Sequence, residues 1–316
     1  MPEGYRGIIP PLVTPFHQDG TVDEVALRAE IDFHLSVGVH GICVTGTSGE
    51  GHTLNKEDSA QIARIAVDEV AGRVPVIAGI IQNSTAVSVE FAEAIAEAGV
   101  HGLQITPVHY LFKPGTDETV YHYRTLAERV GLPLVIYNVV PWSMVEVPAL
   151  LTLTSEVPEV VSVKQSGGDL HKVADLLWAL PEKTTILSAV DDLLYPAFAM
   201  GAHGSVSGSS SLAPQLVLEL WNAVQDGDHA RARDVHRRLL PLWRAVEGNN
   251  MNALMKEAIT AQGRTGGYAR RPVDPVTDAQ RKRIREAVEQ AGLLAGVKVF
   301  LHHAERVGER HVPAGE

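Results

Sequence analysis

The stretch Val160-Val161-Ser162-Val163-Lys164-Gln165-Ser166-Gly167-Gly168-Asp169 joins a valine-rich run to a lysine and a glycine turn. A short β-branched run of this kind is typical of a buried strand. Lysine is among the residues least often fully buried, so Lys164 at the end of a core strand suggests a chemical role. An apolar pocket disfavours the charged form of an amine, and a neutral amine can attack a ketone to form a Schiff base. The alternative is that Lys164 marks the strand end and points into water.

The composition is that of an ordinary globular protein. The chain has 316 residues, 45% hydrophobic and 21% charged, which suits one large α/β domain or two small ones. Its 27 basic and 38 acidic residues give a net charge of −11, which argues against nucleic acid or an anionic membrane as a partner. The single cysteine, Cys43, excludes an internal disulfide and offers no metal-ligand spacing.

The sequence gives no sign of secretion or of a membrane span. The first residues, Met1-Pro2-Glu3-Gly4-Tyr5-Arg6, lack the basic-then-apolar pattern of a signal peptide. No apolar run approaches the roughly 18 residues that a membrane span requires. We therefore expect a soluble cytoplasmic protein.

Strand-like and helix-like segments alternate eight times along the chain. Short apolar strands are predicted at 7–14, 41–45, 74–79, 102–106, 133–138, 160–164, 184–188 and 204–207, and the clearest intervening helices at 22–37, 56–70, 85–98 and 117–130. Strands without polar alternation indicate a parallel sheet covered on both faces. Eight such units predict an α/β fold, a closed (β/α)8 TIM barrel. A doubly wound open sheet is the alternative, weakened because no glycine-rich dinucleotide motif follows the first strand.

After Pro214 the pattern becomes purely helical, with helices predicted at 216–225, 229–246, 250–262 and 277–291. We therefore predict a barrel over residues 1–225 and a C-terminal helical extension over 226–316. The mixed pattern of 293–316 fits one more helix that ends in a frayed tail.

Chemically useful side chains follow the predicted strands, where the active site of such a barrel lies. Gly46-Thr47-Ser48-Gly49-Glu50 offers hydroxyls and backbone N–H groups that can hold a small carboxylate, although the same residues are common in plain turns. Tyr137 can pass a proton or be a core tyrosine with a satisfied hydroxyl. Asp191 and Asp192 either contact a polar substrate or cap the following helix. The histidines show no ligand spacing, so no metal site is predicted.

Taken together, these residues resemble the dihydrodipicolinate synthase and N-acetylneuraminate lyase family of class I aldolases. The family's Gly-Thr/Ser-Thr-Gly-Glu loop is matched by residues 46–50. Its Tyr-Asn-Val/Ile-Pro segment is approximated by Tyr137-Asn138-Val139-Val140-Pro141, and its strand ending in the Schiff-base lysine is matched by Val161-Ser162-Val163-Lys164. The resemblance covers roughly residues 5–225, and the helical tail also fits.

The resemblance implies a mechanism that needs no metal or organic cofactor, because a covalent lysine imine supplies the electron sink. Lys164 attacks the C2 ketone of pyruvate, or of a 2-oxo acid that yields it, and the iminium supports carbanion or enamine chemistry at C3. Thr47 and Ser48 hold the carboxylate. Tyr137 moves protons, assisted by the hydroxyl of Thr47.

Further roles are carried over from the family. The resemblance implies Gly49, Asp191 and Val206 as additional substrate-binding residues, and Thr14 as a support for the loop. A tyrosine from a neighbouring subunit often completes the proton relay, and Tyr110 is the candidate. It lies one place from the expected position, so His109 is the alternative. The family is typically tetrameric, which implies a homo-oligomer built as a dimer of dimers.

Departures from the family pattern narrow the substrate. The lysine-pathway synthases carry an arginine shortly after the Tyr-Asn-Val-Pro segment to bind the aldehyde's carboxylate. Here Pro141-Trp142-Ser143-Met144-Val145 contains none, and Val140 is an extra residue before the proline. This argues against a true dihydrodipicolinate synthase, and Trp142 suits an aromatic aldehyde. Ser188-Ala189-Val190-Asp191-Asp192 is closer to the sugar-acid lyases, although Ala189 replaces a family glycine.

Three functions follow from these residues. The first is a lyase that cleaves or forms a C–C bond between pyruvate and an aldehyde. The second is a dehydratase of a 2-oxo-3-deoxy sugar acid, or a hydratase-aldolase, that uses the same imine. The third is a non-catalytic pyruvate-binding protein, against which the intact set of Lys164, Tyr137 and Thr47 argues.

Overall fold

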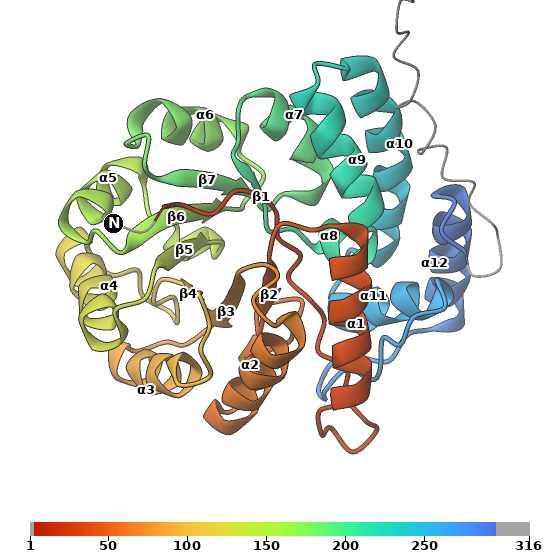
Figure 1. The fold of residues 1–316 in the computed structure, drawn as a ribbon, viewed down its shortest axis with the longest axis horizontal. Coiled ribbons are helices and arrows are strands. Elements are labelled where there is room, and N and C mark those ends of the chain that lie inside the picture. Colours follow the sequence, from red (N-terminus) through yellow and green to blue (C-terminus); the bar gives the residue numbers. More distant parts are fainter. Residues whose placement is uncertain (1–2, 295–316) are drawn as a thin grey trace, which may run out of the picture.

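The computed structural model describes residues 3–294 and contains a barrel of eight parallel strands (Figure 1). The strands follow the order β1-β8-β7-β6-β5-β4-β3-β2. Backbone hydrogen bonds beyond the end of β1 close the barrel: Leu12 N donates to Cys43 O (2.8 Å), and Cys43 N donates to Pro10 O (2.9 Å). The strands are β1 Gly7–Ile8, β2 Ile42–Val44, β3 Val76–Ile80, β4 Gly102–Ile105, β5 Leu134–Asn138, β6 Val160–Gln165, β7 Thr185–Ser188 and β8 Gly204–Ser205. The predicted (β/α)8 barrel is confirmed.

Both faces of the strands are buried, which explains why the sequence shows no polar alternation. Residues such as Ile136 and Val163 face the surrounding helices, and Val135 and Leu187 face the barrel interior. Parallel barrel strands require this double burial. Side chains alternate along each strand, so the inward face that holds Val135 next presents Tyr137.

The first and last strands are shorter than predicted, for local reasons. Pro10 and Pro11 have no N–H to donate to a ladder, so β1 ends at Ile8 although the chain runs on in extended form. After β8, Ser207 becomes the N-cap of a short helix, α8 (Gly208–Leu212), which shortens the predicted strand.

Helices surround the barrel, and several begin at a side chain that caps the first turn. Asp23 caps α1, Asn55 caps α2 and Ser84 caps α3, as is common at helix N-termini. The helices of the barrel layer are α1 Glu24–Val37, α2 Lys56–Val70, α3 Thr85–Ala96, α4 Thr116–Val130, α5 Val147–Glu156, α6 Leu170–Ala179 and α7 Leu194–Ala199. Three short 3-10 turns are η1 Gly51–Thr53, η2 Pro141–Ser143 and η3 Asp191–Leu193. The predicted bounds at 56–70 and 229–246 match the observed ones, and the others differ by one or two residues.

The C-terminal helices gather on one side of the barrel, next to α1 (Figure 1). They are α9 Pro214–Gln225, α10 His229–Val246, α11 Met251–Ala261 and α12 Asp278–Gln290. Helix α10 packs against α9 and α12, and both α10 and α11 contact α8 beside the barrel. The division at residue 225 stays a prediction, and the helix proposed for 293–316 lies almost entirely outside the described residues. No helix within residues 3–294 is long and apolar enough to cross a bilayer.

Candidate active site

Lys164 points into the mouth of the barrel. Its side chain is only 3% exposed, and its Nζ lies 3.6 Å from the centroid of the Tyr137 ring. The two residues are register partners on β5 and β6, so the sheet itself places the amine over the aromatic face. The alternative in which Lys164 points into water is wrong.

Tyr137 has a second contact, made by its hydroxyl. The Oη atom lies 3.2 Å from Oγ1 of Thr47, and either group can be the donor. Tyr137 is buried, whereas Thr47 is half-buried. The ring face of Tyr137 therefore contacts Lys164, while its hydroxyl contacts the loop that follows β2. A proton can pass between the hydroxyls of Tyr137 and Thr47.

The loop Gly46–Glu50 is firmly held. The Thr14 hydroxyl donates to Gly49 O (2.8 Å), which is the supporting contact expected for Thr14. A side chain at position 49 would come within 3.0 Å of Leu12 O and 3.2 Å of the Thr14 hydroxyl, so glycine permits this approach. Ser48 and Gly49 are buried at the barrel mouth.

Glu50 ends this loop in a buried ion pair that the sequence did not reveal. Lys256 Nζ of α11 lies 2.5 Å from Glu50 Oε1 and donates to Tyr268 O at 2.6 Å. Arg270 N donates to the other carboxylate oxygen at 2.8 Å. Burial lowers the pKa of Lys256 to about 8, against the opposing attraction of Glu50. The sequence signal that could have indicated this pair is Lys256, a lysine inside the apolar pattern of the helix predicted at 250–262.

Asp191 and Asp192 follow β7 and have different partners. Asp191 is buried and accepts a hydrogen bond from Ser209 N of α8 at 2.5 Å. Burial raises the pKa of Asp191 to about 6, and the nearby charge of Lys164 opposes this rise. Asp192 pairs with Arg244 of α10 at 2.5 Å. Neither side chain caps the following helix, which has no side-chain cap. Asp191 is therefore held against α8 and Asp192 against α10.

Three further buried side chains are Cys43, Gln104 and Val206. Burial raises the pKa of the Cys43 thiol to about 11, and Lys164 opposes this. Gln104 of β4 projects inward beside Gly46, 3.6 Å from where a Cβ would stand on that glycine. Its amide nitrogen has no hydrogen-bond partner in residues 3–294. Val206 lies in the inner core with Leu187. Cys43 and Val206 thus belong to one apolar cluster inside the barrel.

Tyr110 lies apart from the residues around Lys164. Its side chain is 70% exposed, and those of Leu111 and Phe112 are similarly exposed. His109 is half-buried and its Nδ1 contacts Pro107 O at 3.0 Å. Trp142, also exposed, donates from Nε1 to His109 O at 2.8 Å. Neither Tyr110 nor His109 hydrogen-bonds to Tyr137 or Thr47 in the described part of this chain.

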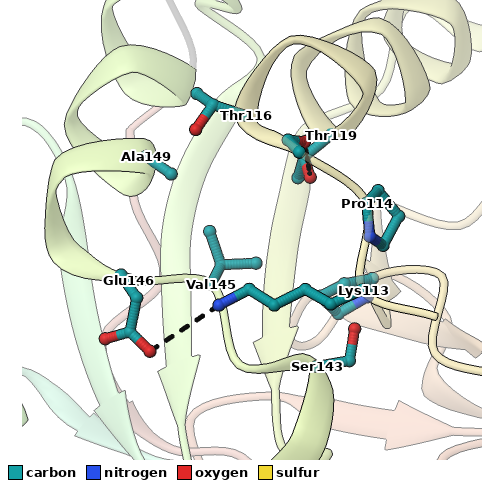
Figure 2. A pocket seen from close by; sticks show the side chains of 10 residues that line it. Lys113, Pro114, Thr116, Thr119, Ser143, Val145, Glu146 and Ala149 are labelled. Carbon is teal, nitrogen blue, oxygen red and sulfur yellow. Dashed lines mark hydrogen bonds and ion pairs between the residues drawn. The ribbon is translucent and has the colours of Figure 1, made fainter.

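A surface crevice separates the start of α4 from η2 and α5 (Figure 2). Lys113 reaches across it to Glu146, 3.7 Å away. Lys172 of α6 also contacts Glu146, at 3.1 Å. Lys113, the lysine that lines this crevice, is therefore in an ion pair with Glu146. Within residues 3–294, no group of three or more His, Cys, Asp or Glu side chains is placed to hold a metal ion.

Comparisons with known proteins give a single family. Residues 4–291 match the model of the dihydrodipicolinate synthetase family. A 4-hydroxy-tetrahydrodipicolinate synthase from Dechloromonas aromatica is 35% identical over 92% of this chain and 99% of its own length. The 4-hydroxy-tetrahydrodipicolinate synthase from Methylibium petroleiphilum is 36% identical over 91% of this chain and 98% of its own length.

Solved structures agree with this result. Dihydrodipicolinate synthase from Aquifex aeolicus superposes with a TM-score of 0.86 at 31% identity, covering 92% of this chain and all of the other. A prophage protein of the same family from E. coli K12, solved with pyruvate, gives 0.87 at 26% identity, covering 92% and 99%. The chain belongs to the dihydrodipicolinate synthetase family, whose members are class I lyases that form a lysine Schiff base with pyruvate.

Proposed function

We propose that Lys164 forms an imine with pyruvate and that the enzyme makes or breaks a C–C bond between C3 of that imine and an aldehyde. The observation that carries the proposal is the buried amine of Lys164 on the face of Tyr137, 3.6 Å from the ring centroid. Attack of the amine on C2 and loss of water give an iminium. This cation draws electrons from C3, so a proton or an aldehyde can leave from that carbon or join it.

The proton route runs through Tyr137 and Thr47. Their hydroxyl oxygens lie 3.2 Å apart, within reach for transfer between them. In this proposal Tyr137 takes and returns the protons of imine formation and C–C bond chemistry. Tyr110 of a neighbouring subunit completes the relay in a dimer of dimers, which the exposure of Tyr110 supports. His109 is the alternative at that position.

The loop after β2 holds the substrate carboxylate. Ser48 and Gly49 contribute backbone N–H groups, and Thr47 and Ser48 contribute hydroxyls. Val206, the residue after β8, supplies an apolar wall and is buried in the inner core. Asp191, buried and fixed by the N–H of Ser209, is the polar residue that this proposal assigns to the rest of the substrate. No metal or organic cofactor takes part in this scheme.

The aldehyde is not the one used to make 4-hydroxy-tetrahydrodipicolinate, despite the names of the curated relatives. The segment Pro141–Val145 carries no basic residue to bind a second carboxylate. Lys113, on the facing loop, is engaged by Glu146. Trp142 instead offers a large exposed aromatic surface, and we propose an aromatic aldehyde as the partner.

A dehydratase of a 2-oxo-3-deoxy sugar acid is the second candidate, and Asp191 favours it. A carboxyl group with a pKa raised to about 6 holds a proton in weakly acidic solution and can donate it to a leaving hydroxyl. The imine step at Lys164 is common to both reactions. They differ in product: pyruvate plus an aldehyde, or a dehydrated 2-oxo acid.

The test is a product analysis by mass spectrometry with three partners. Pyruvate is incubated with an aromatic aldehyde or with the carboxylate-bearing aldehyde that yields 4-hydroxy-tetrahydrodipicolinate, and a 2-oxo-3-deoxy sugar acid is incubated alone. We expect condensation with the aromatic aldehyde. Efficient formation of 4-hydroxy-tetrahydrodipicolinate would overturn the assignment of the aldehyde, dehydration alone would favour the second candidate, and no product from any partner would favour a non-catalytic pyruvate-binding protein.

A further inference from the structure

One side chain of the C-terminal extension contacts the backbone of the loop Gly46–Glu50 directly. Asn252 lies in the first turn of α11 and is 7% exposed. Its Nδ2 donates to Thr47 O at 2.8 Å and to Ser48 O at 3.2 Å. The amide has two N–H groups, and two successive carbonyls of the loop accept them. More than 200 residues of chain separate the donor from its acceptors.

These two hydrogen bonds fix the direction of two peptide N–H groups. In a planar trans peptide, the N–H points opposite to the C=O. With the carbonyls of Thr47 and Ser48 turned toward α11, the N–H groups of Ser48 and Gly49 face away from α11. Neither N–H has a hydrogen-bond acceptor among residues 3–294. Successive backbone N–H groups in a tight loop make a site for an anion.

Other side chains hold the rest of the loop, but not the carbonyls of Thr47 and Ser48. The next carbonyl, Gly49 O, accepts from the Thr14 hydroxyl, and the Glu50 side chain is held by Lys256. Thr47 O also accepts from Glu50 N at 3.1 Å, a contact inside the turn itself. Asn252 is the side chain that ties the Thr47 and Ser48 carbonyls to the body of the protein.

We propose that Asn252 is a positioning residue for substrate binding: it aims the Ser48 and Gly49 N–H groups at the carboxylate of the 2-oxo acid. This role rests on the proposed function, because it takes the loop to be the carboxylate site. The side-chain hydrogen bonds of Asn252 go to the loop and not to Lys164. Loss of Asn252 therefore weakens the binding of a carboxylate without removing the amine that forms the imine.

Asn250, the N-cap residue of α11, is the matched control. It is also 7% exposed, but its amide contacts Asp274 O (3.3 Å) and Gln280 Oε1 (3.4 Å) instead of the loop. Asn252→Leu and Asn250→Leu each replace an amide with an apolar side chain of similar size. Both variants lose buried hydrogen bonds, but only Asn252→Leu releases the carbonyls of the loop.

The experiment measures borohydride trapping of the lysine imine against ligand concentration, with pyruvate and with its methyl ester as probes. For Asn252→Leu, we expect the half-saturating pyruvate concentration to rise at least tenfold while the yield at saturation is kept. The half-saturating concentration of the methyl ester, which lacks the negative charge, should change by less than threefold. Asn250→Leu should bind both probes within twofold of the wild type.

Equal weakening of both probes, or an unchanged pyruvate concentration in folded Asn252→Leu, would overturn the role of Asn252. If Asn252→Leu does not fold, Asn252→Ser is measured in the same way with the same criteria. Failure of the wild-type protein to trap pyruvate at all would instead reject the proposed function, and the role of Asn252 with it.

Discussion

The Nζ atom of Lys164 lies 3.6 Å from the centroid of the Tyr137 ring, across one strand pairing. The ring face packs against the lysine side chain, so the amine is held in place before substrate arrives. The same ring directs its hydroxyl to Thr47, 3.2 Å away. A single tyrosine thus connects the amine to the loop after β2.

The hydroxyl pair predicts coupled effects of two substitutions. Tyr137→Phe and Thr47→Val should each slow exchange of the pyruvate C3 protons with deuterated water by about 10²- to 10⁴-fold, the usual contribution of a general acid–base group. The double variant should be little slower than the worse single one, because both act in one relay. Exchange measured by NMR needs no aldehyde. Tyr195→Phe, whose hydroxyl contacts His229, is the control, and additive losses would contradict a shared relay.

Asp191 predicts a pH dependence of stability. Burial raises its pKa from 3.8 to about 6 in the folded protein, so the native state binds the proton more tightly than the unfolded chain. This contribution to stability is fully present below about pH 4 and is lost as the pH rises through about 6. Asp191→Asn should therefore stabilise the protein at pH 7 by about 3 kcal/mol, and its stability should not decline as the pH rises through 6.

Thermal melts from pH 4 to pH 8 check this expectation. Asp192→Asn is the matched control, because Asp192 forms a partly exposed pair with Arg244 and such pairs contribute at most about 1 kcal/mol. If wild type and Asp191→Asn melt in parallel across the whole range, Asp191 is already ionised in the native protein and the expectation is wrong.

The buried pair of Glu50 and Lys256 predicts a strong non-additive effect. Lys256→Met leaves the Glu50 carboxylate buried without its cation, and Glu50→Gln leaves the ammonium without its anion. Each should lower the free energy of unfolding by about 3–5 kcal/mol. The double variant removes both charges and should lose less than the sum of the two, as measured by urea denaturation. Additive losses would mean that the two charges do not stabilise one another.

The exposed apolar side chains around Tyr110 predict an interface with a second copy. Leu111 and Phe112 are 69% and 77% exposed, and contiguous exposed apolar side chains often mark protein interfaces. Leu111→Asp with Phe112→Glu should reduce the sedimenting mass and lower activity, since Tyr110 then no longer reaches a partner. Trp178→Glu, at an even more exposed aromatic on α6 (91%), should change neither. A wild-type protein that is a fully active monomer would contradict this interface.

The barrel and its central lysine are predictable from sequence because both depend on local patterns. Apolar runs such as Val160–Val163 mark strands that are buried on both faces, and the parallel topology then brings their C-terminal ends together. The pairing of Lys164 with Tyr137 follows from that topology. Thr47 becomes their neighbour because the loop after β2 bends over the barrel mouth.

The contributions of distant residues are not predictable in the same way. Asn252 looks like an ordinary position of a C-terminal helix, and Lys256 stands out only as a lysine in an apolar pattern. The packing of α11 beside the barrel is what gives both of them the loop as a partner. Asp192 has the same chemistry as Asp191, yet it pairs with Arg244 of α10. Sequence spacing alone does not distinguish the two carboxylates, because the partner of each is set by tertiary contacts.

Peptide mapping after borohydride reduction with pyruvate is the most direct test of the imine at Lys164. Lys256 is the informative competitor, since burial lowers its pKa to about 8 although it is paired with Glu50. We predict one reduced-pyruvate adduct, on Lys164, in the wild-type protein and none in Lys164→Ala. An adduct on Lys256 instead, or none on the folded wild-type protein, would contradict the proposed chemistry.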